Sequence, residues 1–232
     1  MILIVADRFD EQVQWLAARW ERHGARILHA GDLSQSGWCF CPGSERWTGV
    51  AGGEPVGSDS ALTGVLNCVP EITCDQLLHI APQDRAYVAR EMTAFLLSWQ
   101  SELTCPVVNR PTPQSLMGPN WSREEWIVTA ARLGVRVRTT TRATHGDLGK
   151  SSGDSLGRAH CVIVAGNRIL GGTAQLQDWA RSLGRAAAVQ FAAFCFSPTD
   201  EPEFLAATLR PDLANPQTAD ALLEVFDGAH AC

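Results

Sequence analysis

The chain has 232 residues, of which 45% are hydrophobic and 19% charged, a composition typical of soluble globular proteins rather than disordered ones. Its formal net charge of -6 and the lack of a basic patch or an RNA-type aromatic motif argue against a nucleic-acid partner. No apolar run approaches the roughly 20 residues that span a bilayer, so we expect no membrane segment and a cytoplasmic location.

The N-terminal half predicts an α/β domain with a parallel sheet. An apolar strand at residues 2–5 is followed by a helical pattern that ends near Gly24, and a second strand begins at Arg26. This strand–helix–strand opening is typical of parallel sheets. Residues 31–64 are rich in glycine and serine and predict hairpins or loops, and residues 66–69 predict a further strand.

Residues 85–99 carry the clearest helical periodicity of the chain, and Val107–Val108 predict a short strand. A connector with four prolines follows at residues 105–126, and we interpret it as a rigid hinge. Ser122 and Glu125 have the spacing of a capping box, which predicts a helix that ends at Gly134.

The C-terminal half predicts a strand at residues 135–141, a polar loop at 142–160 and a hairpin that turns at Gly166-Asn167. A helix closed by Gly184, two strands at 188–196 and 204–209, and a final helix at about 218–226 complete the pattern.

The order of these elements resembles the ATP-grasp superfamily, in particular the RimK-like and microviridin-type peptide ligases. The segments that carry the resemblance are RAYVAREMTAFLLSW, CPVVNRP, WSREEWIVTAARLGVRVRTTT, HCVIVAGNRILGG and WARSLGRAAAVQFAAFCF. HCVIVAGNRILGG is similar to a family hairpin of the type R-x-x-V-x-g-x-r. The resemblance implies a pre-ATP-grasp-like α/β domain at 1–110 and a reduced ATP-grasp-like α+β lobe at 111–232, with the loop at 142–160 in place of most of the nucleotide-binding subdomain.

The same resemblance implies residues that this chain lacks. Ligases of this superfamily activate a carboxylate as an acyl phosphate, which requires lysines, arginines and Mg²⁺ held by carboxylates. Gln190 stands where an aspartate is expected, and Ala206 and Thr208 stand where a Glu-x-Asn pair would align. Lys150 is the only lysine of the chain. The segment around it, GDLGKSSG, lacks the spacing of a phosphate-binding loop.

The sequence therefore predicts a shortened, degenerate and non-catalytic member with no cofactor, which binds a peptide or protein partner of a modification pathway. The alternative is an ATP- and Mg-dependent carboxylate–amine ligase, completed by a partner chain. No residue is predicted to be catalytic or to bind metal. The residues proposed for a ligand or partner cleft are Asn109, Arg110, Lys150, Arg85 and Arg90.

Two further groups of residues leave alternatives open. Cys39 and Cys41 could supply half of a metal site, but no second pair of ligands exists, and packing is the simpler interpretation. His145, Asp147, Asp154 and His160 could bind metal or transfer protons, although a solvated loop is the more ordinary interpretation of such a polar segment. We expect all eight cysteines to be free thiols, as in a reducing compartment.

Overall fold

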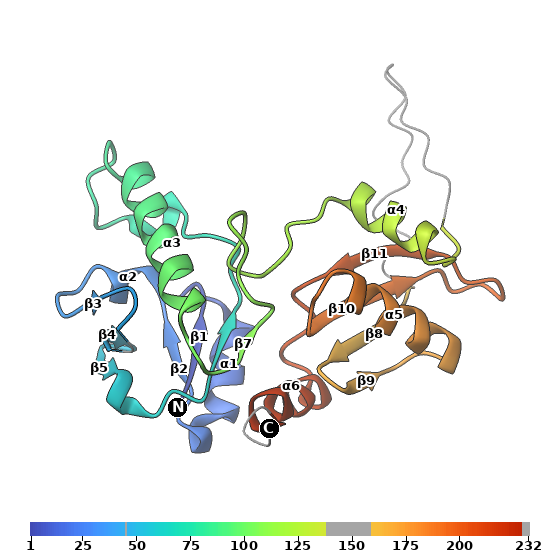
Figure 1. Cartoon of the computed structure of the whole chain (residues 1–232), viewed down its shortest axis with the longest axis horizontal. Helices are drawn as coiled ribbons and strands as arrows, with labels where there is room; N and C mark the ends of the chain where they lie inside the picture. Colours follow the sequence, from blue (N-terminus) through green and yellow to red (C-terminus); the bar gives the residue numbers. More distant parts are fainter. Residues whose placement is uncertain (45, 138–158, 229–232) are drawn as a thin grey trace. The chain divides into compact units, whose positions relative to one another are not determined.

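The structure is a computed structural model that describes residues 1–44, 46–137 and 159–228. The chain divides into two compact units, and each is described by itself. Unit 1 consists of Met1–Asn120 together with Asp212–Cys232, and unit 2 of Trp121–Pro211. The proposed division into domains at residue 110 stays a prediction. The final helix, labelled α6 in Figure 1, is part of unit 1, although it follows unit 2 in the sequence.

Unit 1 is built on a four-stranded sheet in the order β2-β1-β6-β7, in which all neighbouring strands are parallel. The predicted α/β class with a parallel sheet is thus confirmed. The strands are β1 (Ile2–Val5), β2 (Arg26–Leu28), β6 (Gly64–Asn67) and β7 (Val107–Val108). The helices of unit 1 are α1 (Glu11–Arg19), α2 (Ala30–Leu33), α3 (Arg85–Ser101) and α6 (Pro216–Gly228), with short 3₁₀ turns at Glu21–His23, Ser58–Ser60 and Cys74–Leu77.

The two faces of this sheet are covered by different helices. Leu3 and Val65 belong to one buried cluster with Leu96 and Trp99 of α3. Side chains alternate along a strand, so Gly64 points to the opposite face. A Cβ atom at Gly64 would lie 2.1 Å from the Phe226 ring, and this contact places α6 on that face. The glycine is therefore required because a helix packs directly onto the strand.

A second sheet of unit 1 accounts for the segment at 31–64. It is a three-stranded antiparallel sheet of β3 (Cys39–Phe40), β4 (Trp47–Ala51) and β5 (Glu54–Gly57). Its hairpin turns at Gly52 and Gly53, both with left-handed backbone angles, as the predicted hairpins require. The buried carboxylate of Asp32 accepts hydrogen bonds from both glycine N–H groups at 3.1 Å and so ties this turn to α2.

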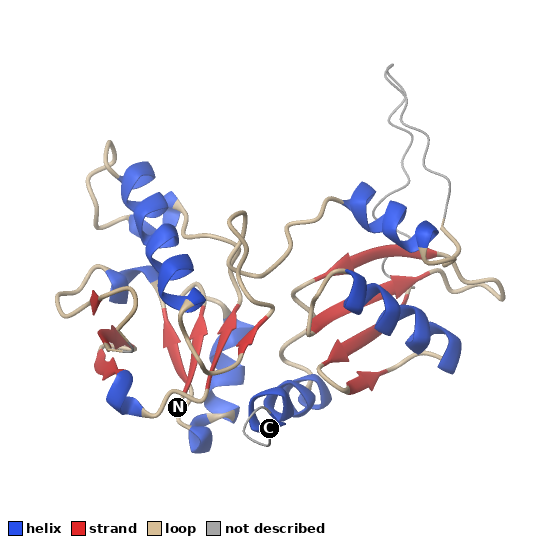
Figure 2. Ribbon diagram, in the orientation of Figure 1, coloured by secondary structure: helices blue, strands red, loops and turns tan. Residues whose placement is uncertain are grey.

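Unit 2 is a four-stranded antiparallel sheet covered on one face by two helices (Figure 2). The capping box of Ser122 and Glu125 is confirmed at the start of α4, with the Glu125 N–H donating to Ser122 Oγ at 3.2 Å. The predicted hairpin at Gly166-Asn167 is also confirmed. The strand order is β11-β10-β8-β9, and the elements are α4 (Arg123–Arg132), β8 (His160–Ala165), β9 (Arg168–Leu170), α5 (Ala174–Ala186), β10 (Phe191–Phe196) and β11 (Phe204–Thr208).

Two predicted boundaries in unit 2 are corrected. Gly184 does not end its helix, because α5 continues to Ala186 and Gly184 packs as a buried residue near Phe194. Of the strand expected at 135–141, Val137 forms one isolated parallel bridge with Phe204, and residues 138–141 lie outside the described part of the chain. Of the helices in the described residues, none combines the length and apolarity needed to cross a membrane.

Candidate functional site

The face of the β10–β11 pair that points away from α4 and α5 is where the resemblance would put metal ligands. Ala193 pairs with Thr208 and Cys195 pairs with Ala206 across the two strands. Directly opposite residues share a face, so these four side chains stand together. None of the four carries a carboxylate, and Mg²⁺ prefers hard oxygen ligands. Among the described residues, no group of three or more His, Cys, Asp or Glu side chains could hold a metal ion.

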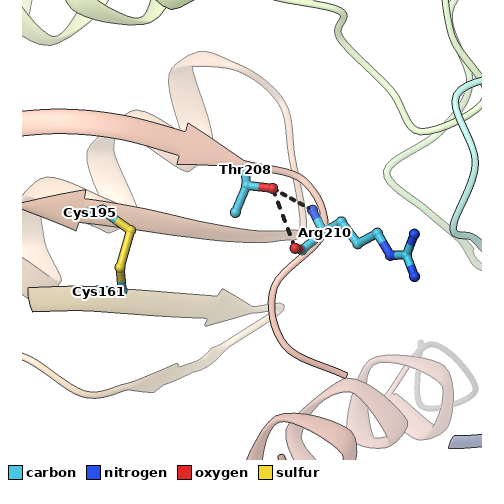
Figure 3. Close-up of a disulfide and its surroundings, with 4 residues drawn as sticks. All are labelled: Cys161, Cys195, Thr208 and Arg210. Atoms are coloured by element: carbon cyan, nitrogen blue, oxygen red, sulfur yellow. Dashed lines mark hydrogen bonds between the residues drawn. A yellow bond between two sulfur atoms is a disulfide. The ribbon is translucent and has the colours of Figure 1, made fainter. Parts of the chain in front are cut away.

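A disulfide between Cys161 and Cys195 crosses this same face (Figure 3). The two residues are directly opposite each other in the β8–β10 register, with their Cα atoms 4.1 Å apart. The expectation that all cysteines are free thiols is therefore wrong for this pair. The strand register brings together two residues separated by 34 positions, and no local pattern in the sequence reveals that register. In the family hairpin R-x-x-V-x-g-x-r, counted back from Gly166, Cys161 stands at the first arginine.

Thr208 is the one of these four residues with a hydroxyl, and that hydroxyl is hydrogen-bonded to the backbone two residues further along the chain. Its Oγ1 accepts a hydrogen bond from the Arg210 N–H at 3.1 Å and donates to the Arg210 carbonyl oxygen at 3.3 Å (Figure 3). Gln190, at the position where an aspartate is expected, is exposed and immediately precedes β10. On this face the structure thus shows two alanines, a threonine that is hydrogen-bonded to the nearby backbone, and a disulfide. The resemblance would place metal-binding carboxylates there.

The predicted cleft residues of the junction have different environments. Asn109 is 3% exposed and has a positive φ of 50°, a conformation that asparagine tolerates better than most residues. Gly118 packs against it, since an added Cβ there would lie 3.2 Å from the Asn109 Cβ. Arg110 is exposed, and its Nη2 donates to the Leu103 carbonyl oxygen at 3.1 Å.

The remaining predicted cleft residues lie on α3 or outside the described residues. Arg85 donates to the carbonyl oxygens of Ile80 at 2.9 Å and Leu78 at 3.0 Å, and so holds the segment that precedes the helix. Arg90 is exposed on the same helix, and Lys150 lies outside the described residues. A shared binding role for these residues stays a prediction.

The alternatives for the cysteines and the histidine-containing loop can be placed in part. Cys39 and Cys41 are exposed and free, so the packing interpretation is wrong for them. His160 is exposed at the start of β8, whereas His145, Asp147 and Asp154 lie outside the described residues.

Three of the hollows among the described residues, all in unit 1, were not predicted from the sequence. The first, which we call the tryptophan cavity, has a volume of about 500 Å³ and is lined by Phe40, Gly43, Ser44, Trp47, Ser58, Ala61, Leu62, Trp99, Glu102, Leu103, Thr104 and Cys105. A second hollow of about 500 Å³ shares Ser44, Trp47 and Ser58 with it and extends to Cys39 and Cys41. The third, of about 290 Å³, lies beyond the carboxyl ends of β1 and β2 and includes Asp7, His29 and His79.

The tryptophan cavity was missed because it depends on long-range packing. Trp47 comes from the antiparallel sheet and Trp99 from α3, and their ring centroids are 5.0 Å apart. The only local signal was the presence of large aromatic side chains in a segment otherwise rich in glycine and serine.

Comparison with known proteins gives a clear result for the fold. No family model matches the chain, and the search of curated proteins found no significant match. Among solved structures, the chain is similar to the macrocyclase MdnC bound with precursor peptide MdnA from Microcystis aeruginosa MRC, with a TM-score of 0.66 and 10% identity over 97% of this chain and 98% of that one.

Two further structures give the same picture. A RiPP-associated ATP-grasp ligase from Chryseobacterium gregarium, in complex with ADP and a leader and core peptide, has a TM-score of 0.61 and 10% identity over 99% of this chain and 95% of that one. The RimK domain protein ATP-grasp from Sphaerobacter thermophilus DSM 20745 has a TM-score of 0.54 and 13% identity over 98% and 99%. The parallel sheet of unit 1 and the antiparallel sheet of unit 2 therefore form the fold of the ATP-grasp ligases, as the resemblance in the sequence predicted.

Proposed function

We propose that the chain is a degenerate ATP-grasp-like protein that performs no nucleotide chemistry and acts as a peptide- or protein-binding partner subunit of a peptide-modification pathway. The observation that carries this proposal is the β10–β11 face, where Ala193, Ala206 and the Cys161–Cys195 disulfide stand in place of metal-binding carboxylates. Without them, and with a single lysine in the chain, little remains to neutralise the charge of a triphosphate.

The peptide-binding part of the proposal is supported by the comparison. MdnC and the Chryseobacterium ligase have this fold, and both were solved with peptides bound. A chain that has lost the ligase residues but keeps the scaffold can still bind a peptide, because binding requires only a complementary surface.

Isothermal titration calorimetry of the full chain with MgATP tests the proposal. We expect no heat of binding up to millimolar nucleotide, with reductant both present and absent so that the disulfide does not decide the result. Binding with a micromolar dissociation constant would overturn the non-catalytic role.

The second candidate is an ATP-dependent carboxylate–amine ligase completed by a partner chain, and the ligase fold favours it. It predicts release of ADP or AMP when the chain is incubated with ATP and the products of neighbouring genes. If no combination turns over nucleotide, this candidate is eliminated.

A cytoplasmic location is also part of the proposal. Cytoplasmic glutathione and thioredoxin keep most protein thiols reduced, so Cys161 and Cys195 would there be thiols. Alkylation of thiols in intact cells before lysis, followed by peptide mapping, checks this. A fully formed disulfide after such trapping would contradict the location and leave the binding role untouched.

A further inference from the structure

Two free thiols stand on one face of the antiparallel sheet of unit 1. Cys39 lies in the edge strand β3, directly opposite Thr48 of β4, and Phe40 lies opposite Trp47. Side chains alternate along a strand, so Cys39 and Cys41 point to the same face and Phe40 points to the other. Both cysteines are exposed and free. The two thiols therefore share one side of the strand.

The lining of the second hollow agrees with this arrangement. Cys39, Cys41 and Thr48 all line it. Phe40 lines the tryptophan cavity instead and packs edge to face against Phe95 of α3. We call this second hollow, of about 500 Å³, the thiol hollow. Because both cysteines are exposed and line one hollow, both sulfur atoms are accessible to the same small ligand.

The spacing of the two thiols suits a bridging metal ion better than a disulfide. The Cα atoms of two such residues on an extended strand are separated by roughly 6.6–7.2 Å. Disulfides favour Cα separations of about 5.5–6 Å and usually stay below about 6.8 Å. A metal ion between the sulfur atoms allows them to lie up to about 4.6 Å apart, for metal–thiolate bonds of about 2.3 Å, against about 2 Å in a disulfide. The pair can therefore bind a metal ion without a bend in the strand.

The number of ligands decides which metal ions fit. A structural zinc site needs four ligands, and among the described residues no group of three or more His, Cys, Asp or Glu side chains could hold a metal ion. Mg²⁺ and Ca²⁺ require several oxygen ligands. Thiolates are soft ligands that prefer Cu(I), and this ion is stable with two sulfur ligands in a linear arrangement. Cu(I) is therefore the metal ion that two thiols alone can hold.

The charged residues of the thiol hollow are compatible with that ion. Cu(I) bound by two thiolates has one net negative charge. Arg46 lines the hollow and offers a guanidinium of opposite charge, while the carboxylate of Asp59 at the same hollow opposes it. Both residues are exposed, so their effects largely cancel and are screened by solvent. The selectivity of the site therefore comes from the two sulfur atoms.

We propose that Cys39 and Cys41 bind one Cu(I) ion between their sulfur atoms. Each thiol releases one proton on binding, and the copper stays in its +1 state, so no electron is transferred. This assignment differs from the expectation, drawn from the sequence, that no residue binds metal. It uses no residue of the β10–β11 face and is independent of the proposed function.

A competition titration on the full chain tests the proposal. Cu(I) is kept reduced by ascorbate in the absence of oxygen, and the coloured Cu(I)–bicinchoninate complex reports how much copper the protein removes. We expect the chain to remove one equivalent of Cu(I), and Zn²⁺ in about tenfold excess should not displace it. Removal of no copper, or displacement of the copper by Zn²⁺, would overturn the proposal.

Serine variants assign the copper to the two thiols. Cys39→Ser and Cys41→Ser should each weaken Cu(I) binding at least about 100-fold, because a serine oxygen is a poor ligand for a soft ion. The controls are Cys74→Ser, which removes an exposed free thiol outside the hollow, and the double variant Cys161→Ser/Cys195→Ser. Both controls should bind copper as the parent does. Parent-like binding by Cys39→Ser, or an equal loss in a control, would contradict the assignment. Thermal unfolding checks that every variant is folded.

Alkylation shows whether one ion bridges both thiols. One equivalent of Cu(I) should protect Cys39 and Cys41 together from iodoacetamide and leave Cys74 reactive, which peptide mapping by mass spectrometry measures. Protection of only one thiol of the pair would indicate separate one-thiol sites and rule the proposal out. None of these measurements involves nucleotide or peptide, so a failure here is distinct from a failure of the proposed function.

Discussion

Cys195 on β10 lies directly opposite Ala206 on β11, and the Cys195 sulfur is bonded to Cys161 on the other neighbouring strand. The resemblance to ATP-grasp ligases would place a glutamate at Ala206. The face that would bind metal in a ligase instead carries a disulfide between two neighbouring strands, and no charged side chain stands at these positions. Because the bond joins two neighbouring strands, β8 and β10, it has consequences for stability that can be measured.

Cys161→Ser and Cys195→Ser should each lower the stability of unit 2 by about 2–4 kcal/mol under oxidising conditions, since a bond that closes a loop of this length restricts the unfolded chain. The two single variants and the double variant should unfold at similar temperatures, because all three lack the same bond. Cys39→Ser, which removes an exposed free thiol, is the control and should unfold like the parent. With reductant present, the difference between parent and variants should shrink to about that of the control.

The amide side chains of Asn67 and Gln100 form a reciprocal pair inside unit 1. Asn67 Nδ2 donates to Gln100 Oε1 at 2.8 Å, and Gln100 Nε2 donates to Asn67 Oδ1 at 3.0 Å. Both residues are buried. Asn67→Leu or Gln100→Met should each cost about 1–3 kcal/mol, because the remaining amide is left buried and unpaired. The double variant should cost less than the sum of the single variants.

Chemical denaturation of the parent, the two single variants and the double variant measures this coupling. Gln217→Met on the exposed surface of α6 is the matched control, and its stability should stay within about 0.5 kcal/mol of the parent. Strict additivity of the two single costs would show that the paired amides do not interact.

Local patterns predicted much of the fold because they depend on neighbouring residues. The Ser122–Glu125 capping box and the Gly166-Asn167 turn are confirmed because each is decided by a few adjacent side chains. The disulfide, the Asn67–Gln100 pair and the tryptophan cavity each join segments more than 30 residues apart, and no single stretch of sequence carries that information. The packing of α6 onto unit 1 was missed for the same reason.

The packing of α6 on β6, where Gly64 faces the Phe226 ring, can be tested by substitution. Gly64→Ala places a methyl group where the Phe226 ring lies, so the helix must shift, and we expect a loss of about 1–3 kcal/mol. Gly184→Ala is the contrast. Its new Cβ would meet its neighbours at 3.6–3.9 Å, an ordinary contact, and alanine favours a helix over glycine by up to about 1 kcal/mol.

Thermal unfolding of both alanine variants separates the two effects. We expect the Gly64 variant to unfold at a lower temperature than the parent and the Gly184 variant at the same or a higher temperature. If Gly64→Ala is neutral, α6 does not pack closely on β6.

Cys105 provides a prediction that depends on pH. Burial raises its pKa above the ordinary value, so the thiolate is disfavoured in the folded protein relative to the unfolded chain. Below the pKa of the unfolded thiol, about 8.5, both states are protonated and this group has no effect on stability. As the pH rises through that value, the unfolded chain loses its proton first, and the folded state is progressively destabilised. Cys105→Ser removes the group, so its stability should fall less steeply between about pH 8.5 and 10 than that of the parent. Urea denaturation at several pH values measures the two slopes. Equal slopes would mean that Cys105 titrates in the folded protein as it does in the unfolded chain, and that the wall of the tryptophan cavity is more open to water than its burial indicates.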